Sequence, residues 1–177
     1  MRSIRHILLV GTSACLLVPA MVQAQAGDSA SLSGTASATL VRPESIVKLE
    51  DLRFGAFMRP TAFSTITIAP SGTVTGSATI AAHMTIAQPV EGRGPAQFLI
   101  TGTPNRLYLV QTPNQINISN GSATMQVRNF TINSFLGLRQ FDGTGQSDLR
   151  VGGQLRVNGN QAPGQYSGNF TITVIFL

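Results

Sequence analysis

Strict alternation of hydroxyl and small apolar residues over twelve positions constrains this chain more than any other sequence feature. From Ser29 to Leu40, every even position is Ala, Leu or Gly, and every odd position is Ser or Thr. A period of two places alternate side chains on opposite faces of a strand, whereas a helix would show a stripe with a period near 3.6. The segment is therefore predicted to be a strand with one apolar face and one hydroxyl face.

The rest of the chain repeats this pattern in shorter runs separated by turn residues. Gly, Pro, Asn and Asp clusters recur about every eight to twelve residues, which is typical of an antiparallel β-sandwich. No stretch needs to be a helix, and 137–147 is expected to be a polar loop. The predicted strands are 46–49, 52–57, 64–69, 73–80, 84–87, 96–101, 107–111, 116–118, 124–127, 129–135, 149–157 with a Gly-Gly bulge or bend, and 165–177.

The first 26 residues are predicted to be a cleaved signal peptide, with one sandwich domain over 27–177. Arg2 and Arg5 precede an apolar run that is too short to span a bilayer, and small residues fit cleavage after Ala24 or Ala26. The protein is therefore expected to be exported, through the periplasm to the cell surface or medium, with no transmembrane segment left after cleavage. Cys15, the single cysteine, would be lost with the signal, so no intramolecular disulfide is expected.

The composition argues against nucleic-acid binding, metal binding and catalysis. Only 11% of residues are charged, and the 12 basic residues are scattered singly rather than in a patch, so nucleic acid is not an expected partner. His83 is the one histidine outside the signal peptide and is expected to lie on the surface of a strand or turn, without a metal. Seven carboxylates with no paired arrangement favour a non-enzyme without a cofactor.

The C-terminal run is the most informative segment for function. Alternate positions from 166 to 176 are mostly apolar, the aromatic Phe176 is penultimate, and Gly164 stands fourteenth from the end. This arrangement resembles the C-terminal signature of subunits assembled by the chaperone–usher route. In that family, a chaperone pairs with the final strand and an extension of the next subunit then replaces it, by strand addition at a sheet edge. The residues assigned to this assembly strand are Gly164, Tyr166, Gly168, Phe170, Ile172, Val174 and Phe176.

The whole chain after the signal is also similar to a bacterial secreted family known as domain of unknown function 4402. That resemblance, together with a layout similar to spore-coat-U-like pilin domains, implies an immunoglobulin-like sandwich. The chain departs from many pilins in having no disulfide, and little sequence precedes Ala36 to serve as a separate donor. The motifs that carry the resemblance are Ala36–Val41, Leu52–Gly55, Thr124–Val127, Val151–Leu155 and Pro163–Phe170.

Two functions are compatible with these features. The first is a structural subunit of a surface fibre or adhesive layer, assembled by β-strand complementation with copies of itself or related subunits, with a periplasmic chaperone and an outer-membrane usher as further partners. Residues 29–41 are then either the first strand or a donor strand, with Ala30, Leu32, Ala36, Ala38 and Leu40 as the donor face. The alternative is a self-complete secreted or periplasmic binding module that uses the loops 92–95 and 137–147.

Overall fold

A computed structural model of the chain describes residues 44–134 and 136–177, all within one compact unit. The predicted signal peptide, 1–26, and the predicted donor segment, 29–41, lie outside the described residues, so their structure is not discussed further.

The described residues form ten strands, and all paired strands are antiparallel, which confirms the all-β prediction. A short helix and a 3-10 turn follow the third strand. The elements are β1 (Ser45–Glu50), β2 (Ser64–Ile68), β3 (Val74–Gly76), α1 (Ala78–Ala81), η1 (Ala82–Met84), β4 (Ala96–Thr101), β5 (Leu107–Gln111), β6 (Gln115–Ser119), β7 (Thr124–Ile132), β8 (Leu138–Gln140), β9 (Gln146–Val157) and β10 (Thr173–Phe176).

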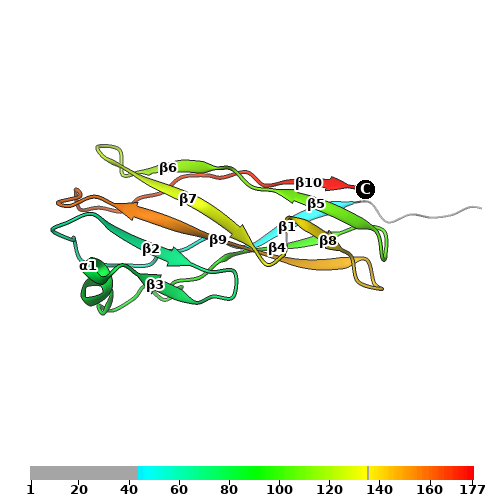
Figure 1. The fold of residues 1–177 in the computed structure, drawn as a ribbon, viewed down its shortest axis with the longest axis horizontal. Coiled ribbons are helices and arrows are strands. Elements are labelled where there is room, and N and C mark those ends of the chain that lie inside the picture. The colour runs from blue at the N-terminus through cyan, green and yellow to red at the C-terminus, as the bar shows by residue number, and fades with distance from the viewer. Residues whose placement is uncertain (1–43, 135) are drawn as a thin grey trace, which may run out of the picture. The chain divides into compact units, whose positions relative to one another are not determined.

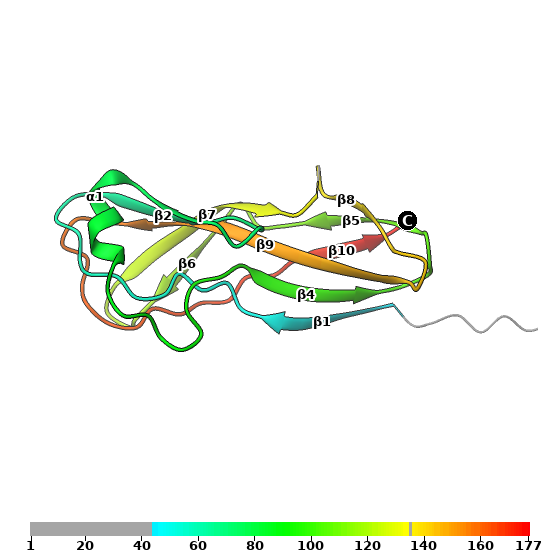
Figure 2. The same cartoon turned by 90° about the horizontal axis from the view of Figure 1, so that it is seen from below.

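The long strand β9 organises the larger sheet, as Figure 1 shows. Its first half pairs with β4, which pairs in turn with β1. Its second half lies between β2, followed by β3, and β7, followed by β6. The smaller sheet has the order β10-β5-β8, with β10 at one edge. Figures 1 and 2 show the two sheets as facing layers, an arrangement consistent with a β-sandwich.

Alternating burial along the central strands builds two apolar clusters between the layers. Strands β2 and β4 bury every second residue, as expected for strands with one face against a core. One cluster joins β4 and β9 to β5, and packs against the inward side chains of the C-terminal segment. The other joins β2, β7 and β9 to Ile80 of α1, with Ile116 and Ile118 of β6 packed against it.

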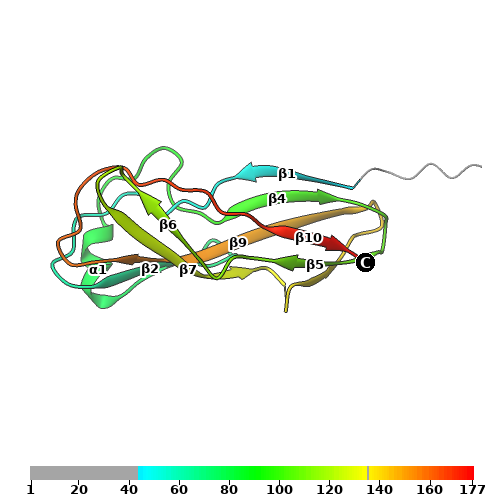
Figure 3. The ribbon, with the colours of Figure 1, turned by 90° about the horizontal axis from the view of Figure 1, so that it is seen from above.

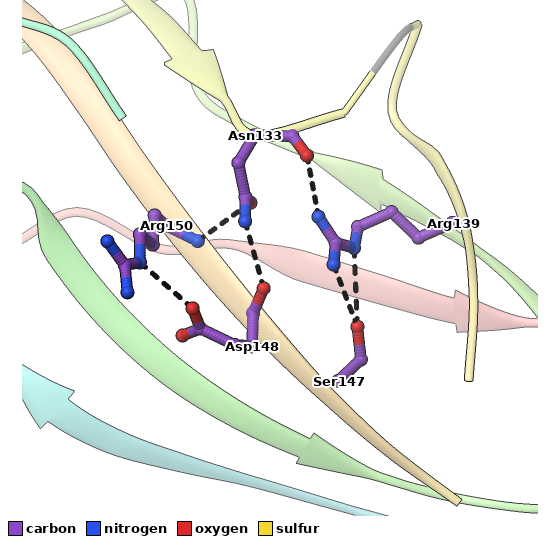
Figure 4. A network of polar contacts seen from close by, with 5 residues as sticks. All are labelled: Asn133, Arg139, Ser147, Asp148 and Arg150. Atoms are coloured by element: carbon purple, nitrogen blue, oxygen red, sulfur yellow. Dashed lines mark hydrogen bonds and ion pairs between the residues drawn. The ribbon is translucent and has the colours of Figure 1, made fainter. Parts of the chain in front are cut away.

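The side chain of Asn133 continues the pairing of β7 with β9 after β7 ends (Figure 4). Its Nδ2 donates to the carbonyl of Asp148 at 3.0 Å, and its Oδ1 accepts from the amide of Arg150 at 2.9 Å. Arg139 also joins Asn133 to β9. Its guanidinium donates to the carbonyl of Asn133 at 2.6 Å and to the hydroxyl of Ser147.

The structure corrects six of the sequence-based elements. Residues 78–84 are helical, although 73–80 and 84–87 were predicted as strands. Segment 52–57 was predicted as a strand but forms only one bridge, from Arg53 to Gly94. The expected loop 137–147 contains β8 and the start of β9. The final strand spans 173–176 rather than 165–177. Strand β9 continues unbroken through its Gly-Gly pair, and the extra residue lies on β7, between Arg128 and Thr131.

Candidate functional site

The described residues enclose an open cavity of about 1000 Å³, called the opening below. One wall is the segment 51–57, which follows β1, and the other is the segment 161–170, which precedes β10. The floor consists of core side chains of the sandwich: Ala96, Phe98, Ile116, Ile118, Met125, Val127, Leu155 and Val157. Of these floor side chains, Ile116 and Ile118 are half-buried, whereas the other six are buried.

The C-terminal wall contains residues that the sequence assigned to the assembly strand. Gly164, Tyr166, Gly168 and Phe170 line the opening. Phe170 anchors this wall, because its ring lies 5.3 Å from the ring of Phe130 and 6.3 Å from that of Phe98, measured between centroids. The hydroxyl of Tyr166 donates to the carbonyl of Ala162 at 2.7 Å, which holds the turn before the wall.

The other three assembly residues lie beyond the opening, in the C-terminal half of the same segment. Ile172, Val174 and Phe176 are half-buried and pack against the core beneath the smaller sheet. Phe176 stacks on Phe141 with ring centroids 6.0 Å apart and an angle of 7° between the planes. The predicted apolar face is thus continuous from Tyr166 to Phe176, although only its last four residues form a regular strand.

The backbone of this C-terminal segment is bonded on one side only. Ser167 exchanges two hydrogen bonds with Ser119 of β6, at 2.8 and 3.0 Å, and the amide of Leu177 donates to Leu107 at 3.0 Å. Because N–H and C=O groups alternate sides along a strand, the even-numbered residues direct theirs away from β5 and β6. Within the described chain, no backbone hydrogen bond involves Tyr166, Gly168 or Phe170. Among the described residues, this side of the segment has no backbone partner.

Within 44–134 and 136–177, nothing buries the core-facing side of strand β1. Ile46 and Lys48 pair directly with Ile100 and Phe98, so they share the face that those buried residues turn to the core. Ile46 is nevertheless 42% exposed, and all six residues of β1 are exposed. Figures 2 and 3 show the reason: β4 and β1 extend past β10, the edge of the facing sheet. A further strand beside β10 would lie over them.

The first wall carries charge at its rim and a half-buried arginine behind it. Lys48 pairs with Asp51 at 2.8 Å, and Arg53 pairs with Glu50. Arg93 donates to the main-chain carbonyls of Phe54, Ala56 and Met84, and its burial lowers the pKa of its guanidinium. Sequence reasoning included Arg93 in the candidate loop 92–95 but gave it no role, and it did not select the wall 51–57, although the Leu52–Gly55 motif was a visible signal.

Other candidates from the sequence contribute little to this site. His83 lies in η1 rather than on a strand, and is half-buried with Nδ1 enclosed and without a hydrogen-bond partner. Of the loops considered for a binding module, Gly92 borders the opening, whereas no residue of 137–147 lines it. No group of three or more His, Cys, Asp or Glu residues in 44–134 and 136–177 could hold a metal ion. In the same residues, no helix has the length and apolar character needed to cross a membrane.

Comparison with known proteins gives one match. The family described as Domain of unknown function (DUF4402) matches residues 45–176, which include both walls and the floor of the opening. No curated protein and no solved structure matches the chain.

Proposed function

The chain belongs to the DUF4402 family, and on that premise we propose that it is an exported structural subunit of a surface fibre or adhesive layer, assembled by β-strand complementation. Its fold would be an immunoglobulin-like sandwich that lacks one strand. The single observation that carries the proposal is the opening, with core residues as its floor and an unpaired backbone edge along one wall.

The missing strand has a defined place. It would pair with the even-numbered residues from Tyr166 to Phe176 and cover Ile46 of β1 and the apolar floor of the opening. Edge strands with free N–H and C=O groups are ready templates for another strand, and natural proteins normally protect them. Along this edge, the described residues supply no such protection.

The sequence contains a segment that fits this place. At about 3.3 Å per residue, the twelve residues 29–40 span about 40 Å, and the eleven from Tyr166 to Phe176 span about 36 Å. The donor face is small, so it can lie close to the apolar floor, and Leu32 and Leu40 would each contribute about 1.5–3 kcal/mol when fully buried. A segment of one copy would complete the sandwich of the next, after a chaperone and usher had delivered the subunits.

A gel of material sheared from expressing cells tests assembly. Unheated and boiled samples of the full chain are compared in SDS. Complemented subunits are expected to run as a ladder at multiples of the monomer mass that collapses on boiling. Leu32→Asp in the donor face should abolish the ladder, whereas Ser33→Asp on the hydroxyl face should leave it. A monomer band in both lanes of the unmodified chain would contradict assembly and favour a self-complete binding module.

A further inference from the structure

The first wall of the opening is held by side chains rather than by a neighbouring strand. Arg53 exchanges two backbone hydrogen bonds with Gly94, at 2.9 and 3.0 Å, and the regular pairing stops there. The next three residues, Phe54, Gly55 and Ala56, line the opening without a backbone partner on a strand. Side chains nevertheless bond to the carbonyls of Phe54 and Ala56 and to the amide of Ala56.

Gln88 takes the place of a strand neighbour for Ala56. Its Oε1 accepts from the amide of Ala56 at 3.0 Å, and its Nε2 donates to the carbonyl of the same residue at 3.0 Å. This pair of bonds has the form that two opposed residues exchange in an antiparallel ladder. The side chain therefore uses both backbone groups of Ala56.

Arg93 caps the carbonyls on the same stretch. Its Nε donates to Phe54 at 3.0 Å, and one terminal nitrogen donates to Ala56 at 2.5 Å and to Met84 at 3.1 Å. The three ion pairs of the described residues join Lys48 to Asp51, Arg53 to Glu50 and Arg150 to Asp148, so none involves Arg93. A half-buried guanidinium bonded only to carbonyls serves the backbone that it caps.

Gly55 makes this arrangement possible. Its φ is +67°, a conformation that L side chains rarely adopt. A Cβ at this position would overlap Gln88 Oε1 and come within 2.6 Å of Arg93 Cγ. Both side chains therefore lie directly against the glycine, and Gln88, Arg93 and Gly55 act as one unit, called the clamp below.

The clamp makes the two walls chemically unequal. On the first wall, the carbonyls of Phe54 and Ala56 and the amide of Ala56 are already bonded. On the C-terminal wall, Tyr166, Gly168 and Phe170 have no backbone partner among the described residues. A strand that enters the opening gains hydrogen bonds from the C-terminal wall and mainly apolar contact from the other.

We propose that Arg93 and Gln88 are positioning residues for strand complementation, which hold the first wall apart and direct the incoming strand to the C-terminal edge. This inference rests on the proposed function. Without the clamp, the freed backbone groups of Phe54 and Ala56 would compete for the incoming strand, or the first wall would close onto the floor. Either change would slow capture of the strand at the C-terminal edge.

Capture of a synthetic peptide by the full chain tests the inference. The peptide carries residues 29–41 and a fluorophore, and the acceptor chain carries Leu32→Asp and Leu40→Asp, so that its own segment cannot compete. Capture rates are compared for this acceptor and for Arg93→Gln, Arg93→Lys and Gln88→Ala added to it. Arg128→Gln is the matched control, because Arg128 lies on β7 and does not line the opening. All rates are measured at a temperature where urea curves show each variant fully folded.

Arg93→Gln is expected to slow capture at least tenfold, Arg93→Lys less, and Arg128→Gln not at all. Amide hydrogen exchange gives a readout that a merely structural role would not move. In the acceptor, the peptide should protect Tyr166, Gly168 and Phe170 but not change Ala56. In Gln88→Ala, the peptide should protect Ala56 as well. If Arg93→Gln does not fold, the result for Gln88→Ala tests the inference in its place. Unchanged capture rates and unchanged amide protection in the clamp variants would overturn the role of the clamp but leave the proposed function standing. No capture by the acceptor itself would overturn the proposed function, and the clamp with it.

Discussion

At the scale of single residues, Asp142 holds the turn between β8 and β9. One carboxylate oxygen accepts from the amide of Gln146 at 2.9 Å, the hydroxyl of Thr144 at 2.7 Å and the amide of Thr144 at 2.8 Å. These bonds, that from Gln146 first and that from the Thr144 hydroxyl next, lower the pKa of Asp142 below its ordinary value of 3.8.

This depressed pKa predicts an acid dependence with a defined sign. Because the folded pKa is the lower one, the stabilisation is complete above the ordinary value and is lost as pH falls through the folded value. The amide of Thr144 should therefore lose protection from hydrogen exchange only below about pH 4. In Asp142→Asn, which keeps the acceptor but does not titrate, protection should be independent of pH over this range. An equal loss in both proteins would contradict the assignment.

Asn133 offers a second test at this scale. Replacing it with Ala removes two hydrogen bonds to β9 (Figure 4) and leaves the amide of Arg150 without that acceptor. We expect a loss of about 1–2 kcal/mol in the free energy of unfolding, measured with urea. Asn114→Ala is the matched control at an exposed position. Equal midpoints for the two variants would show that the Asn133 bonds do not stabilise the loop.

Side chains that replace strand neighbours could not be predicted from the sequence. Asn133 and Gln88 bond to backbone groups 15 and 32 residues away, respectively. In the sequence both are polar residues near turns, as are many others in this chain. Their role exists only after the fold has placed an unpaired backbone beside them.

At the scale of elements, the close passage of β9 beneath the end of β2 depends on Gly152. A Cβ there would overlap the carbonyl oxygen of Ile68 and lie 3.0 Å from atoms of Ala69 and Pro70. Gly152→Ala must push backbone away from backbone, and we expect it to cost about 1–3 kcal/mol of stability, as overpacking does. Gly143→Ala, whose Cβ would meet nothing within 4 Å, should be nearly neutral. Thermal unfolding of the two variants compares them, and equal midpoints would refute the close passage.

Phe176 links the final strand to the core. Its ring stacks on Phe141 and is half-buried. We expect Phe176→Ser to lower the free energy of unfolding by about 2–3 kcal/mol, somewhat less than removal of a fully buried ring. Leu177→Ser, at a side chain that is 52% exposed, should change it little. If both variants unfold at the same urea concentration, and the secreted yield of Phe176→Ser is unchanged, this strand does not close the core.

Most strands could be predicted because their alternation needs no knowledge of neighbours. The errors have physical causes. Residues 78–84 alternate poorly and contain three alanines, so their pattern does not distinguish a helix from a strand. In the structure, the helix α1 buries Ile80. Residues 165–172 alternate well, yet pairing requires a partner, and β6 supplies one only at Ser167.

At the scale of the whole described unit, the sequence could predict an all-β antiparallel fold but not where its sheets end. Alternation predicts which side of a strand is apolar, and it does so equally for a covered and an uncovered strand. The exposure of Ile46 and the opening between 51–57 and 161–170 depend on where the sheets end. The C-terminal residues were assigned to one face from the sequence, and 92–95 was named as a candidate loop, whereas the wall 51–57 and the roles of Gln88 and Arg93 were not predicted.

Cross-linking between two copies tests the central claim most directly. In a Cys15→Ser background, one tagged full-length chain carries Thr171→Cys, on the exposed side of the C-terminal segment. A second chain with a different tag carries Ser33→Cys, Thr35→Cys or Ser37→Cys on the hydroxyl face of the donor segment. Neighbouring strands bring such side chains within disulfide distance. We predict a disulfide between the two tags for at least one donor position, and none when Thr75→Cys on β3 replaces Thr171→Cys. No disulfide at any donor position, or equal yields at Thr171 and Thr75, would contradict complementation between subunits.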